Sequence, residues 1–103
     1  MLTLMNVRKQ ITNCIIDGPL ALDNAISIEA AKQKGIQSKV AGDADLLITT
    51  NLDTGNVLYK ALNFMANGTT AAIITGARVP IVLTSRADSE LSKLYSIALA
   101  ASL

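Results

Sequence analysis

The chain has 103 residues, half of them hydrophobic, with a mean hydropathy of +0.40 and a formal net charge of +1. It contains one cysteine and no histidine, which excludes an internal disulfide, serine–histidine and cysteine–histidine catalysis within this chain, and the usual zinc ligand sets. Nucleic-acid binding is not expected either, because the sequence has no basic run and only two tyrosines and one phenylalanine for base stacking.

The N-terminal half predicts helices that alternate with short strands. In chain order the pattern predicts the end of a helix, a strand, a helix, a loop and a strand, at residues 2–9, 14–16, 22–30, 36–44 and 46–48. The turn residues Asp17-Gly18-Pro19 end the first strand, and Gly35 ends the helix. Cys14 is interpreted as a small core residue of its strand rather than as a nucleophile.

The C-terminal half continues the alternation. It predicts a helix, two neighbouring strands and a last helix, at residues 53–65, 71–74, 79–83 and 91–99. Asp53 is the expected cap of the first of these helices, and Asn67-Gly68 ends it. The two strands are joined through Gly76, and we expect them to be adjacent and antiparallel.

Strands that are apolar throughout indicate a sheet that is covered on both faces. Together with helices between the strands, they predict a three-layer α/β/α fold with a mostly parallel sheet. The apolar surplus is large for a small domain, so we expect it to be covered by another domain or subunit. No apolar stretch is long enough for a membrane span, and the N-terminal residues carry their charge after the apolar ones, the reverse of a signal peptide. A cytoplasmic protein without membrane contact is therefore expected.

A polar turn, Thr84 to Ser89, opens directly at the end of a predicted strand and before a helix. Anions bind at such places because helix N-termini present free N–H groups. Arg86 could form a fork on a phosphate, and Ser85 could donate a hydrogen bond to the same anion. The alternative is that Arg86 pairs with a surface carboxylate while Asp88 or Ser89 caps the helix.

The helix after Gly55 carries a polar face. Asn56, Lys60 and Asn63 share this face, and Tyr59 borders it. A solvated helix face explains the same pattern, and spacing alone favours that explanation.

Three blocks of the sequence together resemble the phosphate acetyl/butyryl transferase family, most closely its phosphate butyryltransferase branch. They are DGPLALDNAIS (17–27), AGDADLLITTNLDTGNVLYKAL (41–62) and GARVPIVLTSRADSELSKLYSIALA (76–100). The resemblance implies the reaction acyl-CoA plus inorganic phosphate giving acyl phosphate plus coenzyme A. Coenzyme A is then a substrate, and neither a cofactor nor a metal is expected.

The resemblance implies two α/β domains, similar to the isocitrate/isopropylmalate dehydrogenase-like fold, with a cleft between them. Members of this family commonly form dimers. The resemblance implies that residues 1–103 are the C-terminal portion of such an enzyme. Residues 1–78 would belong to the second domain, and residues 79–103 would be a last strand and helix that return to the first. A missing N-terminal domain or subunit and a homo-oligomer are the implied partners.

The resemblance also implies roles for individual residues. Ser85 would stabilise the oxyanion formed on the acyl carbonyl, and Arg86 would hold phosphate or the phosphates of coenzyme A. Asn56, Tyr59 and Lys60 match the family pattern GN-x-x-YK and would line the substrate side of the cleft. Among the residues that bind substrate, phosphate or coenzyme A we also place Asp88, the carboxylate nearest to Ser85 and Arg86.

The base that deprotonates the coenzyme A thiol is not assigned, since the matching position is Ser92, which cannot act as a base. Two other functions stay open beside the enzyme. One is a non-catalytic acyl-CoA-binding module, and the other is a truncated fragment without activity. Acyl-chain length is also open, because one methylene changes binding by only about 1–3 kcal/mol.

Overall fold

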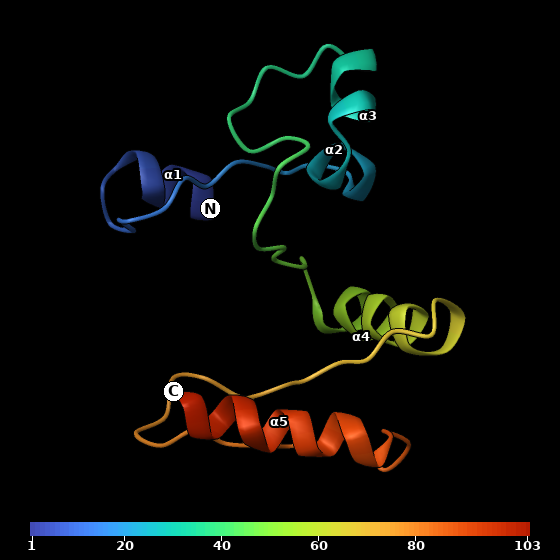
Figure 1. The fold of residues 1–103 in the computed structure, drawn as a ribbon. Coiled ribbons are helices and arrows are strands. Elements are labelled where there is room, and N and C mark those ends of the chain that lie inside the picture. Colours follow the sequence, from blue (N-terminus) through green and yellow to red (C-terminus); the bar gives the residue numbers. More distant parts are fainter. The chain divides into compact units, whose positions relative to one another are not determined.

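A computed structural model describes all residues from Met1 to Leu103 (Figure 1). The helices are α1 (Leu2–Val7), α2 (Leu22–Ile26), α3 (Ile28–Gln33), α4 (Leu52–Lys60), the π-helix η1 (Ala61–Met65) and α5 (Glu90–Ser102). The chain divides into two compact units, residues 1–48 and 49–103. The boundary expected between residues 78 and 79 concerns the full family fold and stays a prediction.

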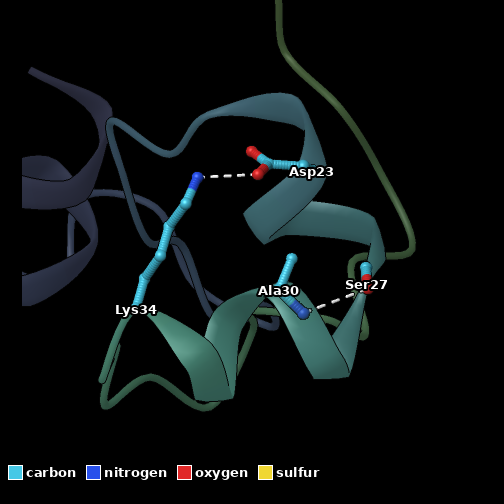
Figure 2. A network of polar contacts seen from close by, with 4 residues as sticks. All are labelled: Asp23, Ser27, Ala30 and Lys34. Carbon is cyan, nitrogen blue, oxygen red and sulfur yellow. Dashed lines mark hydrogen bonds and ion pairs between the residues drawn. The ribbon is translucent and has the colours of Figure 1, made fainter.

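In the first unit, the helix predicted over residues 22–30 is two helices, because Ser27 leaves the helical conformation with φ −121° and ψ 115°. The Ser27 hydroxyl caps α3 by accepting a hydrogen bond from the Ala30 N–H at 3.2 Å. The Lys34 ammonium and an Asp23 carboxylate oxygen lie 2.7 Å apart and tie the end of α3 to the start of α2 (Figure 2). Two short helices thus replace one longer helix.

Helix α3 ends where the sequence predicts. Gly35 has a φ of +63°, and its N–H bonds to the Lys32 carbonyl at 3.0 Å. The Ile36 N–H bonds to the Ala31 carbonyl at 3.0 Å. These two bonds form a Schellman motif, which satisfies carbonyls that the helix leaves free. The predicted stop at Gly35 is confirmed.

The backbone predicted as a strand at residues 14–16 is bonded to a side chain instead. The Asn6 amide donates to the Cys14 carbonyl at 3.0 Å, and its oxygen accepts from the Ile16 N–H at 3.2 Å. These backbone groups are therefore not paired with another strand in this structure. Cys14 is exposed, so its interpretation as a core residue is wrong here.

The second unit begins with α4, whose cap differs from the predicted one. The Asn51 side chain accepts a hydrogen bond from the Thr54 N–H at 2.8 Å, whereas Asp53 lies inside the first turn. A carboxylate there still interacts favourably with the helix dipole. The helix continues into η1 and ends at Asn67, with φ +53°, where the Gly68 N–H bonds to the Leu62 carbonyl at 2.8 Å. The predicted Asn67-Gly68 end is confirmed.

The two C-terminal strands meet at one residue pair. Ile74 and Ile81 form an isolated antiparallel bridge, with the Ile74 N–H donating to the Ile81 carbonyl at 2.8 Å. The expected antiparallel neighbours are thus confirmed at this pair, without a longer ladder. Residues 46–48 are unpaired and exposed. A strand needs a neighbour for its backbone groups, and this structure contains only the single bridge. The three-layer α/β/α fold therefore stays a prediction.

Most large apolar side chains are exposed, and the buried apolar residues are Ala25 and Ala31 alone. On α5 the buried residues are Ser92 and Ser96, while its apolar side chains face outward. The Ser96 hydroxyl accepts from the Ala72 N–H at 3.0 Å and holds the segment before the bridge against the helix. The surplus of apolar surface expected from the composition is confirmed. None of the helices combines the length and the apolar character that crossing a membrane requires.

Candidate functional site

The polar turn before α5, residues 84–89, is closed by its own hydrogen bonds. The Ser85 N–H donates to Asp88 Oδ2 at 2.7 Å, and the Asp88 N–H donates back to the Ser85 carbonyl at 3.1 Å. Ser89 is the cap of α5, since its hydroxyl accepts from the Ser92 N–H at 3.1 Å. Of the two caps that the sequence allowed, Ser89 is confirmed, and Asp88 closes the turn instead.

Two consecutive residues of α4 reach this turn. The Tyr59 hydroxyl donates to Asp88 Oδ1 at 2.6 Å, and the Lys60 ammonium donates to Ser85 Oγ at 3.5 Å. Both contacts lie within the second compact unit. The structure therefore brings together four of the residues that the sequence singled out, although the two pairs are separated by 29 and 25 positions.

The Lys60 ammonium is held by aromatic rings rather than by a carboxylate. It lies 5.1 Å from the centroid of the Tyr59 ring and 5.6 Å from that of Phe64. Such cation–π contacts orient a cation without neutralising its charge. The only ion pair of the chain is Lys34–Asp23 in the first unit, so no carboxylate oxygen lies within ion-pair distance of Lys60, although its charge acts on the nearby Asp88 carboxylate.

The hydrogen bonds of the Ser85 hydroxyl determine what it can still do. A hydroxyl has one proton to donate and two lone pairs that accept. Ser85 Oγ accepts from the Ala87 N–H at 3.3 Å and from the Lys60 ammonium at 3.5 Å. Both bonds use its lone pairs, so the hydroxyl keeps its own proton as a donor.

Both oxygens of the Asp88 carboxylate accept hydrogen bonds, which keeps it ionised. The Tyr59 hydroxyl contributes most to lowering the pKa of Asp88 below its ordinary value of 3.8. The Ser85 N–H and the charges of Lys60 and Lys93 act in the same direction, while partial burial opposes them. A carboxylate with both oxygens engaged and a lowered pKa is a weak proton acceptor.

The remaining predicted residues occupy different places. Arg86 is exposed in the turn and forms no ion pair, so the alternative in which it pairs with a surface carboxylate is not seen. Asn56 does not contact the turn but lines an open cavity of about 420 Å³ at the start of α4, together with Thr49 and Tyr59. Tyr59 is thus shared between this cavity and the Asp88 contact.

A second cavity, of about 270 Å³, lies between η1 and the turn. Some of the residues that line it were not predicted from the sequence to belong to the site. Asp88 and Ser92 line it from the C-terminal side, and Asn63 and Phe64 line it from η1. The side-chain oxygen of Asn63 is buried without a hydrogen-bond partner. Phe64 could have been found from its spacing, since it lies four residues after Lys60 on the same side of the helix.

Comparison with known sequences gives a match over almost the whole chain. The pattern that describes the family named phosphate acetyl/butaryl transferase matches residues 2–101. A phosphate acetyltransferase of Thermotoga maritima is 60% identical over 101 residues, which are 98% of this chain and 34% of the relative. A phosphate butyryltransferase of Clostridium acetobutylicum is 52% identical over 98% of this chain and 34% of the relative.

Among solved structures, a branched-chain phosphotransacylase from Enterococcus faecalis V583 matches with a TM-score of 0.78 and 38% sequence identity. The match covers 93% of this chain and 36% of that structure. The chain thus spans about a third of the length of the relatives it matches. Acetyl and butyryl enzymes both occur among them, so the identities alone do not decide the acyl group.

Proposed function

Because this chain belongs to the phosphate acetyl/butaryl transferase family, we propose that it forms part of an enzyme that transfers a short, butyryl-like acyl group between coenzyme A and inorganic phosphate. A phosphate oxygen attacks the thioester carbonyl carbon, and negative charge develops on the carbonyl oxygen. The carbon–sulfur bond then breaks. The proton that phosphate loses ends on the sulfur of coenzyme A, so the products are acyl phosphate and the free thiol.

The observation that carries this proposal is the free proton of the Ser85 hydroxyl. The Ala87 N–H and the Lys60 ammonium donate to Ser85 Oγ, and Lys60 places a positive charge beside it. A donor fixed in this way stabilises an oxyanion without having to reorganise during the reaction. In the proposed reaction, Ser85 donates to the carbonyl oxygen as its charge develops.

The two cations serve the anionic substrates. Arg86 is exposed beside Ser85 and can present its guanidinium fork to inorganic phosphate or to the phosphates of coenzyme A. Lys60 contributes charge at the same place, held by the Tyr59 and Phe64 rings. Asn56, on the cavity at the start of α4, is proposed to contact a more distant part of the acyl-CoA.

The exposed apolar side chains support a larger assembly. The relatives are about three times as long, and we propose that the remainder of the family fold, as a domain or subunit, covers these side chains. In that assembly the segments at residues 14–16, 46–48, 71–74 and 79–83 would join the three-layer α/β/α sheet, and two copies would associate. Acyl-CoA and phosphate are cytoplasmic metabolites, so we place the protein in the cytoplasm.

The test is an assay of butyryl-CoA with phosphate, following the release of free thiol. It compares this chain alone with a chimera in which residues 1–103 replace the matching segment of the Clostridium acetobutylicum relative. We expect turnover in the chimera and little in the chain alone, because both walls of the cleft are needed to orient the substrates. A folded chimera that binds butyryl-CoA without turnover would instead favour a binding module, and one that does neither would favour an inactive fragment.

A further inference from the structure

The carboxylate of Asp88 is the one group that contacts both the polar turn, residues 84–89, and α4 through separate atoms. Its Oδ2 accepts from the Ser85 N–H at 2.7 Å, and its Oδ1 accepts from the Tyr59 hydroxyl at 2.6 Å. Both bonds are short and go to an ionised acceptor, the class of hydrogen bond that is strongest and most directional in proteins. Each oxygen of the carboxylate thus has a donor within the protein.

We propose that Asp88 is a positioning residue, which fixes the Ser85 hydroxyl beside the Lys60 ammonium by binding the Ser85 backbone and the Tyr59 phenol at once. This assignment rests on the proposed function for its catalytic consequence. It differs from a substrate-binding role, because a carboxylate repels phosphate and coenzyme A. It also differs from a general-base role, because the two donors stabilise the ionised carboxylate and so weaken it as a base.

The geometry explains why the fixing of Ser85 depends on both partners. The contact between Lys60 and Ser85 Oγ is long, at 3.5 Å, and cannot by itself hold the turn against α4. Tyr59 precedes Lys60 directly in the helix, so its bond to Asp88 sets the distance between the turn and that ammonium. Removal of either side of the bond would let Ser85 move away from Lys60.

The first readout does not depend on activity. In the chimera at pH 7, we expect Asp88→Asn to speed hydrogen exchange at the Ser85 amide about tenfold, because the bond to a charged acceptor is lost. The matched control is Glu90→Gln, which neutralises an exposed carboxylate two residues away that makes no such contact. Equal exchange rates at Ser85 in the native protein and Asp88→Asn would overturn the assignment.

The second readout separates positioning from the other roles. We expect Asp88→Asn and Tyr59→Phe each to lower kcat about tenfold, with KM for phosphate and for butyryl-CoA changed less than about twofold. The double variant should be no slower than the slower single variant, because the two residues act as one unit. The pH dependence of kcat/KM should keep its shape in all of them.

Other outcomes contradict the proposal in recognisable ways. A rise in KM with an unchanged kcat would make Asp88 a substrate-binding residue. Loss of a limb of the pH profile in Asp88→Asn, but not in Tyr59→Phe, would make it a base. If the native chimera shows no turnover, the proposed function fails, and the Ser85 amide exchange still decides whether Asp88 holds the turn.

Discussion

The hydroxyl of Tyr59 donates a 2.6 Å hydrogen bond to the carboxylate of Asp88, 29 positions further along the chain. This bond joins α4 to the turn before α5 and sets Lys60 beside Ser85. Neither residue identifies the other from the sequence, because each also fits an ordinary surface position on its own element. Substitutions in this cluster should therefore change activity and stability in measurable ways.

Loss of the Ser85 hydroxyl should slow the reaction on the order of 10²-fold in kcat, the usual effect of removing one oxyanion donor. The measurement is the thiol-release assay on the chimera carrying Ser85→Ala. Ser85→Thr keeps a hydroxyl and should retain more activity than Ser85→Ala. Equal kcat values for the native chimera and Ser85→Ala would show that this hydroxyl does not stabilise the oxyanion.

Replacement of Arg86 by alanine should lower kcat/KM for phosphate by roughly 10²-fold, because a charge-assisted fork on the anion is lost. Arg86→Lys keeps the charge without the planar fork, so its kcat/KM for phosphate should lie between the values of the native chimera and of Arg86→Ala. Arg78, an exposed arginine that the site does not include, supplies the matched control Arg78→Ala. If Arg78→Ala and Arg86→Ala lose activity equally, the effect belongs to net charge and not to the turn.

The bonds of Asp88 should make the acid stability of the chain depend on Tyr59. The pKa of Asp88 is lowered in the folded state, so its contribution is present above 3.8 and is lost as the pH falls through the lower folded value. Tyr59→Phe removes the main cause of the lowering, so the contribution of Asp88 should be smaller in this variant, and its loss should be complete at a higher pH, closer to 3.8. Urea midpoints measured from pH 7 to pH 3 test this, with Tyr95→Phe as the control. Identical pH curves for the two variants would contradict the Tyr59–Asp88 bond.

The stability of α5 should be kept only when the residue at position 89 can still accept a hydrogen bond from the helix N-terminus. Ser89→Ala should lower the free energy of unfolding by about 1 kcal/mol, because the Ser92 N–H loses its acceptor. Ser89→Asp offers a carboxylate oxygen in the same place and should preserve the stability. Urea unfolding measures both, and equal destabilisation by the two substitutions would assign Ser89 a role other than capping.

Two glycines of the first unit form a matched pair. A Cβ at Gly42, where φ is +82°, would lie 2.6 Å from Ile28 Cα, whereas a Cβ at Gly35, where φ is +63°, would meet nothing within 4 Å. Gly35→Ala should therefore lower the free energy of unfolding by about 1–2 kcal/mol, solely because alanine is strained at this positive φ. Gly42→Ala should cost more, since backbone must move. A smaller loss of unfolding free energy for Gly42→Ala would contradict the packing of this loop on α3.

The sequence by itself determined two helix ends and the family. Helical spacing and turn residues predict the ends at Gly35 and Asn67-Gly68, because each depends on a backbone conformation within a few residues. The cap of α4 shows the limit of such signals. Asp53 is the expected cap, whereas Asn51 has the extended backbone that a cap requires and accepts the hydrogen bond.

The tertiary structure alone decided which side chains meet. Asn6 bonds the backbone of residues 14–16, a competition that no apolar pattern reveals. The same holds for the site, since the sequence supplied Tyr59, Lys60, Ser85 and Asp88 as separate candidates. Their pairing depends on distances of 2.6 and 3.5 Å between atoms of elements that are far apart in the chain. Local propensity acts over a few neighbouring residues, and only the folded backbone sets distances across α4 and the turn.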